Sequence, residues 1–151
     1  MRNNKRKPIL TIVRGLPGSG KSTYARKLAD ETGAMIIEPD ALLVFGGEYH
    51  YTPERYIMAC DTAGSLAWHL GQKGIDMIYA DVLPTKDDVL KVRTTVWDKV
   101  MPADKRHVIV VHDMPLLTVE ESMARNRHAV RRKDIERMAK EWEPWEEKND
   151  E

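Results

Sequence analysis

The chain of 151 residues contains only one cysteine, Cys60, so it cannot form an internal disulfide. No apolar run approaches the roughly 20 residues that a membrane-spanning helix requires, and the first residues lack the apolar core of a secretory signal. These absences lead us to expect a protein of a reducing, cytoplasmic compartment with no membrane partner. Cys60 stands in a stretch of helical pattern, where we expect it to pack rather than react.

The chain also lacks an excess of charge of either sign, since 24 Lys and Arg balance 24 Asp and Glu. A net charge of zero therefore gives no indication of a polyanionic partner such as a nucleic acid. The ends differ, however, because residues 1–7 are basic and residues 144–151 are acidic. No repeat is present, and the length is typical of one domain, so we expect a single domain over 1–151 flanked by two solvated tails.

The most informative motif is Gly15–Ser22, which fits G-x-x-x-x-G-K-[ST] without a mismatch. An apolar run, Ile9–Val13, precedes it, and a helical pattern, Ser22–Asp30, follows it. In a strand, turn and helix of this kind, backbone N–H groups and a helix N-terminus converge on a phosphate chain. The motif in this context predicts binding of a nucleoside triphosphate, and a chance match is the weaker interpretation.

Each residue type in this loop suits a task. Gly15, Gly18 and Gly20 allow conformations and close approaches that a Cβ would hinder. Lys21 supplies a point charge to the terminal phosphates, and the hydroxyl of Ser22 is suited to ligate Mg²⁺. We therefore expect ATP and Mg²⁺ as cofactors, with the nucleotide contacted by Gly15, Pro17, Gly18, Ser19, Gly20, Lys21, Ser22 and Thr23.

Apolar and amphipathic segments alternate along the chain, which is typical of an α/β fold with a parallel sheet between layers of helices. We expect a three-layer αβα arrangement around a four-stranded parallel sheet. The strands are expected near residues 9–14, 34–38, 76–80 and 107–112, and the helices over 21–31, 53–72, 86–100, 119–126 and 132–142. Residues 46–51 are expected to form a loop, and Trp142 and Trp145 to fold back as an apolar clasp.

Three aspartates follow predicted strands, at the end where ligands bind in an open parallel sheet. Asp40 is the best candidate for a general base, because a carboxylate near the γ-phosphate can accept the proton of an attacking hydroxyl. Asp81 is expected to hold Mg²⁺ through water or to brace Lys21. For both, capping of the next helix is the alternative interpretation. Asp113 is equally compatible with a site and a structural role.

A basic cluster spans residues 125–133. In a protein that transfers phosphoryl groups, such arginines form a lid that neutralises developing charge, and Arg125 and Arg127 are the candidates for this catalytic and ATP-binding role. The alternative is a solvated helix face, which is also the expected role of Lys133. The five histidines are too scattered to predict a metal cluster, and His50 is a candidate for touching the acceptor.

With these features in place, the chain resembles the P-loop kinases of the phage polynucleotide kinase and zeta-toxin group. The resemblance is carried by Ile9–Ile12, Gly15–Thr23, Asp40, Asp81 and Arg125–Asn126, and it spans about residues 8 to 143. It implies a small AAA-type ATP-binding kinase in which Asp40 is the base for a 5′-hydroxyl. It also implies a cytoplasmic location, in the host cytoplasm for a phage-encoded protein.

Two positions depart from the polynucleotide kinase pattern. That family carries an arginine three residues after its catalytic aspartate, where this chain has Leu43, and Arg131 replaces a usual proline in a short lid. The expected reaction is transfer of the γ-phosphoryl group of ATP to a hydroxyl, with the 5′-hydroxyl of a polynucleotide as first choice. A hydroxymethylated base in phage DNA, a nucleoside or nucleotide, a sugar nucleotide as in zeta toxins, and a non-catalytic ATP-binding switch stay open. No obligate protein partner is inferred.

Overall fold

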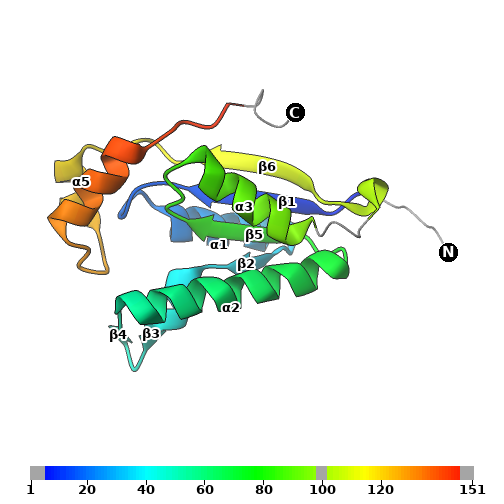
Figure 1. The fold of residues 1–151 in the computed structure, drawn as a ribbon, viewed down its shortest axis with the longest axis horizontal. Helices are drawn as coiled ribbons and strands as arrows, with labels where there is room; N and C mark the ends of the chain where they lie inside the picture. The colour runs from blue at the N-terminus through cyan, green and yellow to red at the C-terminus, as the bar shows by residue number, and fades with distance from the viewer. Residues whose placement is uncertain (1–5, 98–101, 147–151) are drawn as a thin grey trace.

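A computed structural model of the protein describes residues 6–97 and 102–146 (Figure 1). Its central sheet has four parallel strands in the order β2 (Met35–Ile37), β5 (Met77–Asp81), β1 (Ile9–Arg14) and β6 (Val108–Asp113). β1 pairs with β5 on one side, where Val13 lies opposite Ala80, and with β6 on the other, where Val13 lies opposite His112. The four expected strands are confirmed, with ends shifted by no more than one residue.

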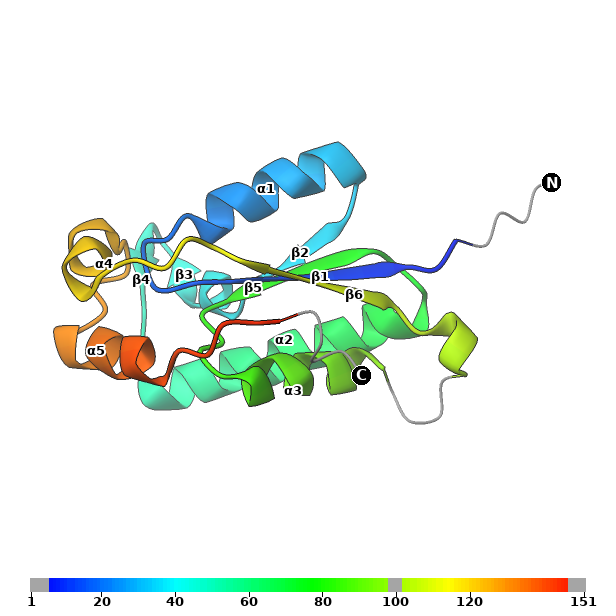
Figure 2. The ribbon, with the colours of Figure 1, turned by 90° about the horizontal axis from the view of Figure 1, so that it is seen from above.

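Helices cover both faces of this sheet, as expected for three layers. α1 (Lys21–Thr32) lies on one face, and α2 (Pro53–Gln72) and α3 (Lys86–Val96) lie on the other (Figure 2). Thr52 caps α2 by accepting a hydrogen bond from the backbone N–H of Arg55, and Thr85 and Asp88 form a capping box at the start of α3. We expected the third helix to reach residue 100, but α3 ends at Val96. Residues 98–101 lie outside the described part of the chain.

β1 forms the centre of the core because both of its faces are covered. Leu10 and Ile12 are fully buried in the cluster that includes α2 and α3, and Val13 is fully buried in the cluster that includes Ala25 of α1. A strand buried on both faces needs a continuous apolar run rather than an alternating one, which explains the sequence from Ile9 to Val13. The loop that follows β1 is thereby anchored to the most buried strand.

The segment from residue 39 to 49 contains regular structure where the sequence analysis expected a loop over residues 46–51. It contains a 3₁₀ helix, Pro39–Leu43, followed by a small antiparallel hairpin of β3 (Val44–Phe45) and β4 (Glu48–Tyr49). Gly46 and Gly47 form the turn with φ values of 62° and 77°. Two consecutive residues with positive φ are characteristic of a tight hairpin turn, and this pair of glycines was the signal that the loop interpretation missed.

Two short helices, α4 (Val119–Arg125) and α5 (Arg132–Glu141), lie beyond the carboxyl ends of the strands (Figure 1). Thr118 and Glu121 form a capping box at the start of α4. Arg132 joins the two helices through ion pairs with Glu120 of α4 and Glu136 of α5. A further short 3₁₀ helix, Ala103–Lys105, precedes β6 at the opposite end of the sheet.

Arg14, the last residue of β1, is fully buried and joins three segments. Its guanidinium donates to the carbonyl oxygens of Leu83 (2.8 and 3.0 Å) and Pro84 (3.1 Å) and pairs with Asp113 at 3.3 Å. It also lies 4.2 Å from the centre of the Trp142 ring. Burial lowers the pKa of Arg14, against the opposing attraction of Asp113.

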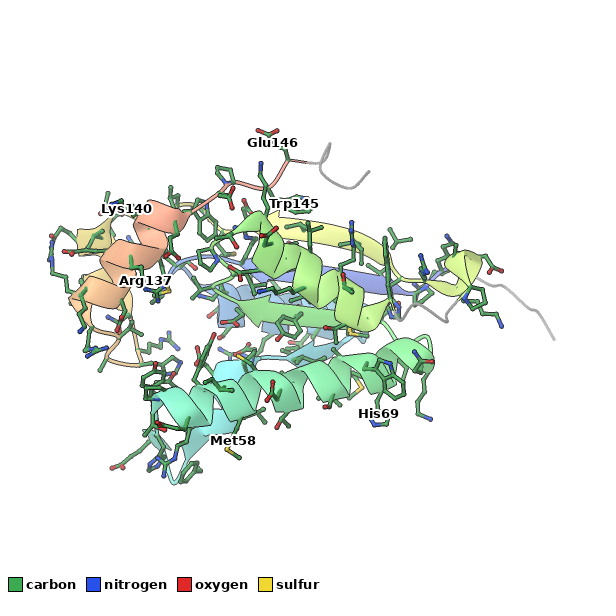
Figure 3. The ribbon with its side chains drawn as sticks, viewed as in Figure 1. Met58, His69, Arg137, Lys140, Trp145 and Glu146 are labelled. Atoms are coloured by element: carbon green, nitrogen blue, oxygen red, sulfur yellow. The ribbon has the colours of Figure 1, made fainter. Side chains whose placement is uncertain are left out.

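The segment after α5 turns back along the sheet, as the clasp hypothesis expected. The backbone N–H of Trp145 donates to Asp113 at 3.0 Å, and the Trp145 side chain packs against the core cluster beside β6 (Figure 3). Arg137 and Lys140 project from α5 in the same view. Asp113, which the sequence left equally open to a site or a structural role, therefore holds Arg14 and the backbone of Trp145.

None of the helices in the described residues is long and apolar enough to cross a membrane.

Replacement of Arg14 by leucine should lower the free energy of unfolding by about 2–4 kcal/mol, because it leaves buried carbonyls and the carboxylate of Asp113 without their donor. Urea unfolding monitored by circular dichroism measures this loss. Arg6→Leu is the matched control, since Arg6 also pairs with an aspartate, Asp76, but its side chain is 63% exposed. Equal losses in the two variants would contradict the anchoring role of Arg14.

Candidate active site

The loop between β1 and α1 has the form of a phosphate cradle. Gly18 and Gly20 have φ values of 80° and 91°, in the left-handed region that favours glycine. A Cβ at Gly15 would collide with the side chain of Ser19 and come within 2.9 Å of Met114. The hydroxyl oxygen of Ser19 is buried and has no hydrogen-bond partner. An unpaired polar atom inside a loop of this shape is suited to a polar ligand.

Lys21, the first residue of α1, points back over this loop. Its ammonium nitrogen donates to the carbonyl oxygen of Leu16 at 3.1 Å. Loss of hydration lowers the pKa of Lys21, although the nearby carboxylates of Asp81, Asp40 and Glu38 act in the opposite direction. The sheet thus brings Lys21 within electrostatic reach of three carboxylates at the carboxyl ends of β2 and β5.

Glu38 is a site residue that the sequence analysis missed. It was assigned to the end of a strand, but its carboxylate accepts a hydrogen bond from the hydroxyl of Ser22 at 3.0 Å. The structure therefore gives Ser22 a carboxylate partner on the neighbouring element. The signal that could have found Glu38 is the one used for Asp40 and Asp81, namely its place at the carboxyl end of a parallel strand.

Asp81, the last residue of β5, is buried, with 6% of its surface exposed. It accepts hydrogen bonds from the hydroxyl of Tyr56 (3.2 Å) and from the backbone N–H of Val82 (2.8 Å). Burial, and to a lesser extent the charge of Asp40, raises the pKa of Asp81 to about 6, while Val82, Lys21 and Tyr56 oppose the rise. A buried acid of this kind gains from a cation placed beside it.

Asp40 lies in the 3₁₀ helix after β2 and is linked to the hairpin. Its Oδ1 atom accepts a hydrogen bond from the hydroxyl of Tyr49 at 2.7 Å. Desolvation and this carboxylate raise the pKa of Tyr49 well above its usual value, so the hydroxyl keeps its proton. The ring of Tyr49 stacks on His128, with their centres 4.2 Å apart. Neither Tyr49 as a partner of Asp40 nor His128 as a site residue was predicted.

The basic segment after β6 lies over the phosphate loop, as expected for a lid. Ser122 of α4 is fully buried and its hydroxyl donates to the carbonyl oxygen of Pro17 at 2.6 Å. A Cβ at Gly18 would lie 2.7 Å from the Cβ of Arg125 and 2.9 Å from the backbone nitrogen of Asn126. Arg125 is therefore seated at the loop, where it pairs with Glu121 at 3.7 Å.

The remaining candidates of the basic segment have different positions. Arg127 is exposed in the turn between α4 and α5, which the side chain of Asn126 stabilises by accepting from the backbone N–H of Val130. Arg131 pairs with Asp134 at 3.1 Å, and Lys133 is exposed. The contact with Gly18 thus places Arg125 at the phosphate loop, whereas the role of Arg127 stays a prediction.

His50 belongs to the hairpin rather than to the cleft. Its ring stacks on Phe45 with the centres 3.7 Å apart, and its Nε2 atom lies 3.1 Å from the carbonyl oxygen of Phe45. Leu43, at the position where the polynucleotide kinase pattern has an arginine, is buried. Leu43 therefore offers no charge to an acceptor, and the expectation that His50 touches the acceptor stays a prediction.

The residues present fit a triphosphate and a hard cation. The glycine cradle, the unpaired Ser19 hydroxyl and Lys21 suit the phosphates, and the oxygens of Ser22, Glu38 and Asp81 suit Mg²⁺. Within residues 6–97 and 102–146, no group of three or more His, Cys, Asp or Glu side chains forms a metal site. Mg²⁺ is commonly held by one or two protein oxygens together with substrate phosphates, so Ser22 and Asp81 remain the proposed ligands.

The sheet order, the helices on both faces and the loop after β1 define the P-loop kinase fold. The family model described as "AAA domain" matches residues 10–148, and the chain belongs to this family. No curated protein matches the chain. Among solved structures it is similar to a chain of the Pnkp1/Rnl/Hen1 RNA repair complex, with 21% identity and a TM-score of 0.68 over 93% of this chain. The match covers 46% of that longer chain.

Two further structures extend the likeness to kinases of small molecules. A sugar kinase from Janibacter sp. HTCC2649 has 17% identity and a TM-score of 0.63, with 93% of this chain and 80% of that chain covered. A gluconokinase from Sinorhizobium meliloti 1021 has 18% identity and a TM-score of 0.53, with 93% and 78% covered. At these identities the likeness shows the fold, which confirms the predicted three-layer α/β architecture and the resemblance to P-loop kinases.

Replacement of Asp81 by asparagine should stabilise the protein in a pH-dependent way. The pKa of Asp81 in the folded protein, about 6, is above its ordinary value of 3.8. The folded state therefore binds this proton more tightly, and stability falls as the pH rises between these values. The variant should gain little near pH 3.5 and about 3 kcal/mol at pH 7.5. Urea unfolding of both proteins across this range measures the difference, and a gain that does not grow with pH would contradict the burial argument.

Proposed function

We propose that the protein is a kinase that transfers the γ-phosphoryl group of ATP to a hydroxyl group. One observation carries the proposal: the ammonium group of Lys21 lies beside a glycine cradle that fits phosphates, within electrostatic reach of the carboxylate of Asp40. Phosphoryl transfer depends mainly on positioning and on neutralising charge, and this arrangement supplies both, together with a proton acceptor. A binding-only switch needs no carboxylate at this place.

In the proposed roles, the loop amides and Lys21 bind the phosphates of the donor. Ser22 and Asp81 would hold Mg²⁺, and the bound ion would neutralise part of the phosphate charge. Glu38 orients the Ser22 hydroxyl, to which it is already hydrogen-bonded. Arg125, seated against Gly18, and Arg127, exposed in the adjoining turn, cover the transferring group.

Asp40 is the proposed general base. As the acceptor hydroxyl forms its bond to the γ-phosphorus, its proton passes to the carboxylate and the bond from the γ-phosphorus to the bridging oxygen of ADP breaks. The hydrogen bond that Tyr49 now donates to Asp40 Oδ1 has the geometry that an acceptor hydroxyl requires. We therefore propose that Tyr49 stands in for the acceptor hydroxyl at this oxygen and yields to it before transfer.

For the acceptor, the 5′-hydroxyl of a polynucleotide is our first proposal. The ring centres of Tyr49 and Tyr51 are 6.2 Å apart, and those of Tyr51 and Tyr56 are 6.1 Å apart. Tyr49 is hydrogen-bonded to Asp40, and aromatic rings in such a group can stack on bases. A hydroxyl of a nucleoside, a modified base or a sugar is the second candidate. It is favoured by the burial of Leu43, which leaves no cation at that position to engage a strand phosphate.

Asp40→Asn should lower kcat by about 10²–10⁴-fold, because an amide cannot accept the proton, while ATP affinity stays nearly unchanged. Transfer from γ-labelled ATP to 5′-hydroxyl DNA and RNA, hydroxymethylated DNA, nucleosides and sugar nucleotides measures the rate and identifies the acceptor. Asp30→Asn, an exposed carboxylate on α1, is the matched control and should keep full activity. Full activity in the Asp40 variant would remove Asp40 from the mechanism.

Tyr49→Phe should raise kcat/KM for the acceptor by about 5- to 10-fold, because the acceptor no longer displaces a hydrogen bond worth about 1 kcal/mol. The ring that stacks on His128 is retained in this variant. Steady-state kinetics at saturating ATP measure the change, with Tyr51→Phe as the control in the same aromatic group. A fall in kcat/KM would show that the hydroxyl positions Asp40 instead of blocking it.

A further inference from the structure

Buried side-chain nitrogen and oxygen atoms without hydrogen-bond partners lie in only two places in the described part of the chain. One is the hydroxyl oxygen of Ser19 in the phosphate loop. The other place holds three such atoms, Nε of Arg93, Nε of Arg106 and Nδ1 of His107. Buried polar atoms are normally paired, so unpaired ones mark a strained or a ligand-binding position. The first of these places is the candidate nucleotide site, which gives reason to examine the second.

The second group lines a single pocket of about 350 Å³ at the end of the sheet opposite the phosphate loop. The pocket lies where the end of α3 meets the start of β6, and β1, which is six residues long, places ~20 Å of strand between the two regions. The lining residues are Lys7, Arg93, Trp97, Ala103, Arg106, His107, Val108 and Ile109. This pocket belongs to no part of the site described above.

The pocket combines cationic groups with an aromatic wall. The guanidinium carbons of Arg93 and Arg106 lie 4.8 and 5.7 Å from the centre of the Trp97 ring. Trp97 itself is fixed, because its indole N–H donates to the carbonyl oxygen of His107 at 2.8 Å. Guanidinium groups held on an aromatic ring are oriented in advance, so little side-chain freedom is lost when they bind an anion.

His107 adds an acceptor to the two arginine donors. It is 1% exposed, and its Nε2 atom lies 2.7 Å from the carbonyl oxygen of Ile75, to which it can only donate. The neutral ring therefore presents Nδ1 as a free acceptor. The carboxylate of Asp76, the nearby negative charge, is already paired with Arg6 and with the backbone N–H of Ile9. The residues that line the pocket thus hold two unpaired N–H donors and one unpaired acceptor, all three of them buried atoms.

We propose that this pocket binds the phosphate of a nucleoside monophosphate or of a 5′-phosphorylated strand end. A phosphate monoester has several acceptor oxygens for Arg93 and Arg106 and, in its monoprotonated form, an O–H that can donate to His107. A carboxylate at neutral pH has no such donor. The volume exceeds that of a bare phosphate, and Trp97, Val108 and Ile109 provide the apolar lining that a base requires.

Isothermal titration calorimetry with adenosine monophosphate tests the proposal on the full chain, with the phosphate loop first saturated with Mg²⁺ and a non-hydrolysable ATP analogue. Adenosine monophosphate should bind one further site, and affinity should fall at least tenfold in the Arg93→Gln/Arg106→Gln double variant. Arg26→Gln, an exposed arginine on α1, is the control and should bind as the unaltered protein does. Adenosine without phosphate should bind at least tenfold more weakly.

A second measurement does not depend on the variants. In NMR spectra of the unaltered protein, adenosine monophosphate should shift the indole N–H signal of Trp97, assigned with Trp97→Phe. Comparison of one oligonucleotide with a 5′-phosphate and with a 5′-hydroxyl separates a strand end from a free nucleotide. No binding, binding that the double variant retains, or an unmoved Trp97 signal would overturn the proposal. Kinase activity does not decide it, because the two sites lie at opposite ends of the sheet.

Discussion

The parallel pairing of β2, β5, β1 and β6 is the constraint on which the rest of the structure depends. It brings the carboxyl ends of all four strands to one edge, although the residues there are as far apart in sequence as Arg14 and Asp113. Charged and polar side chains gather at that edge, where burial raises the pKa of Asp81 and lowers that of Lys21. Shifts of this kind are typical of functional sites. A bound polyphosphate with its cation would give each buried charge a partner and so offset the cost of burying it.

Around this edge, a series of contacts joins segments that are distant in the sequence. Ser122 fixes α4 on the phosphate loop, His128 in the turn after α4 stacks on Tyr49, and Tyr49 is hydrogen-bonded to Asp40. The candidate base and the candidate lid are thus joined through one tyrosine. Movement of the lid would alter the surroundings of Asp40, which gives a physical route by which closing over the donor and admitting the acceptor are coupled.

The sequence predicted the features that depend on local chemistry. The phosphate loop, the four strands and the acidic residue that ends β5 follow from short patterns of residue type. It could not predict Tyr49 on Asp40 or His128 on Tyr49, because these pairs form only when separate segments pack together. Arg14 shows the same limit. An arginine after an apolar strand suggests a surface charge, and only the packing of residues 83–84, 113 and 142 around it explains its burial.

A crystal structure with Mg²⁺ and a non-hydrolysable ATP analogue tests the central claim most directly. The account predicts that the triphosphate lies along the backbone amides from Leu16 to Thr23, with its terminal phosphorus facing the carboxylate of Asp40 across the cleft. It also predicts that the Ser19 hydroxyl gains its missing partner. An empty loop, or a bound nucleotide with Asp40 directed away from the terminal phosphate, would contradict the account.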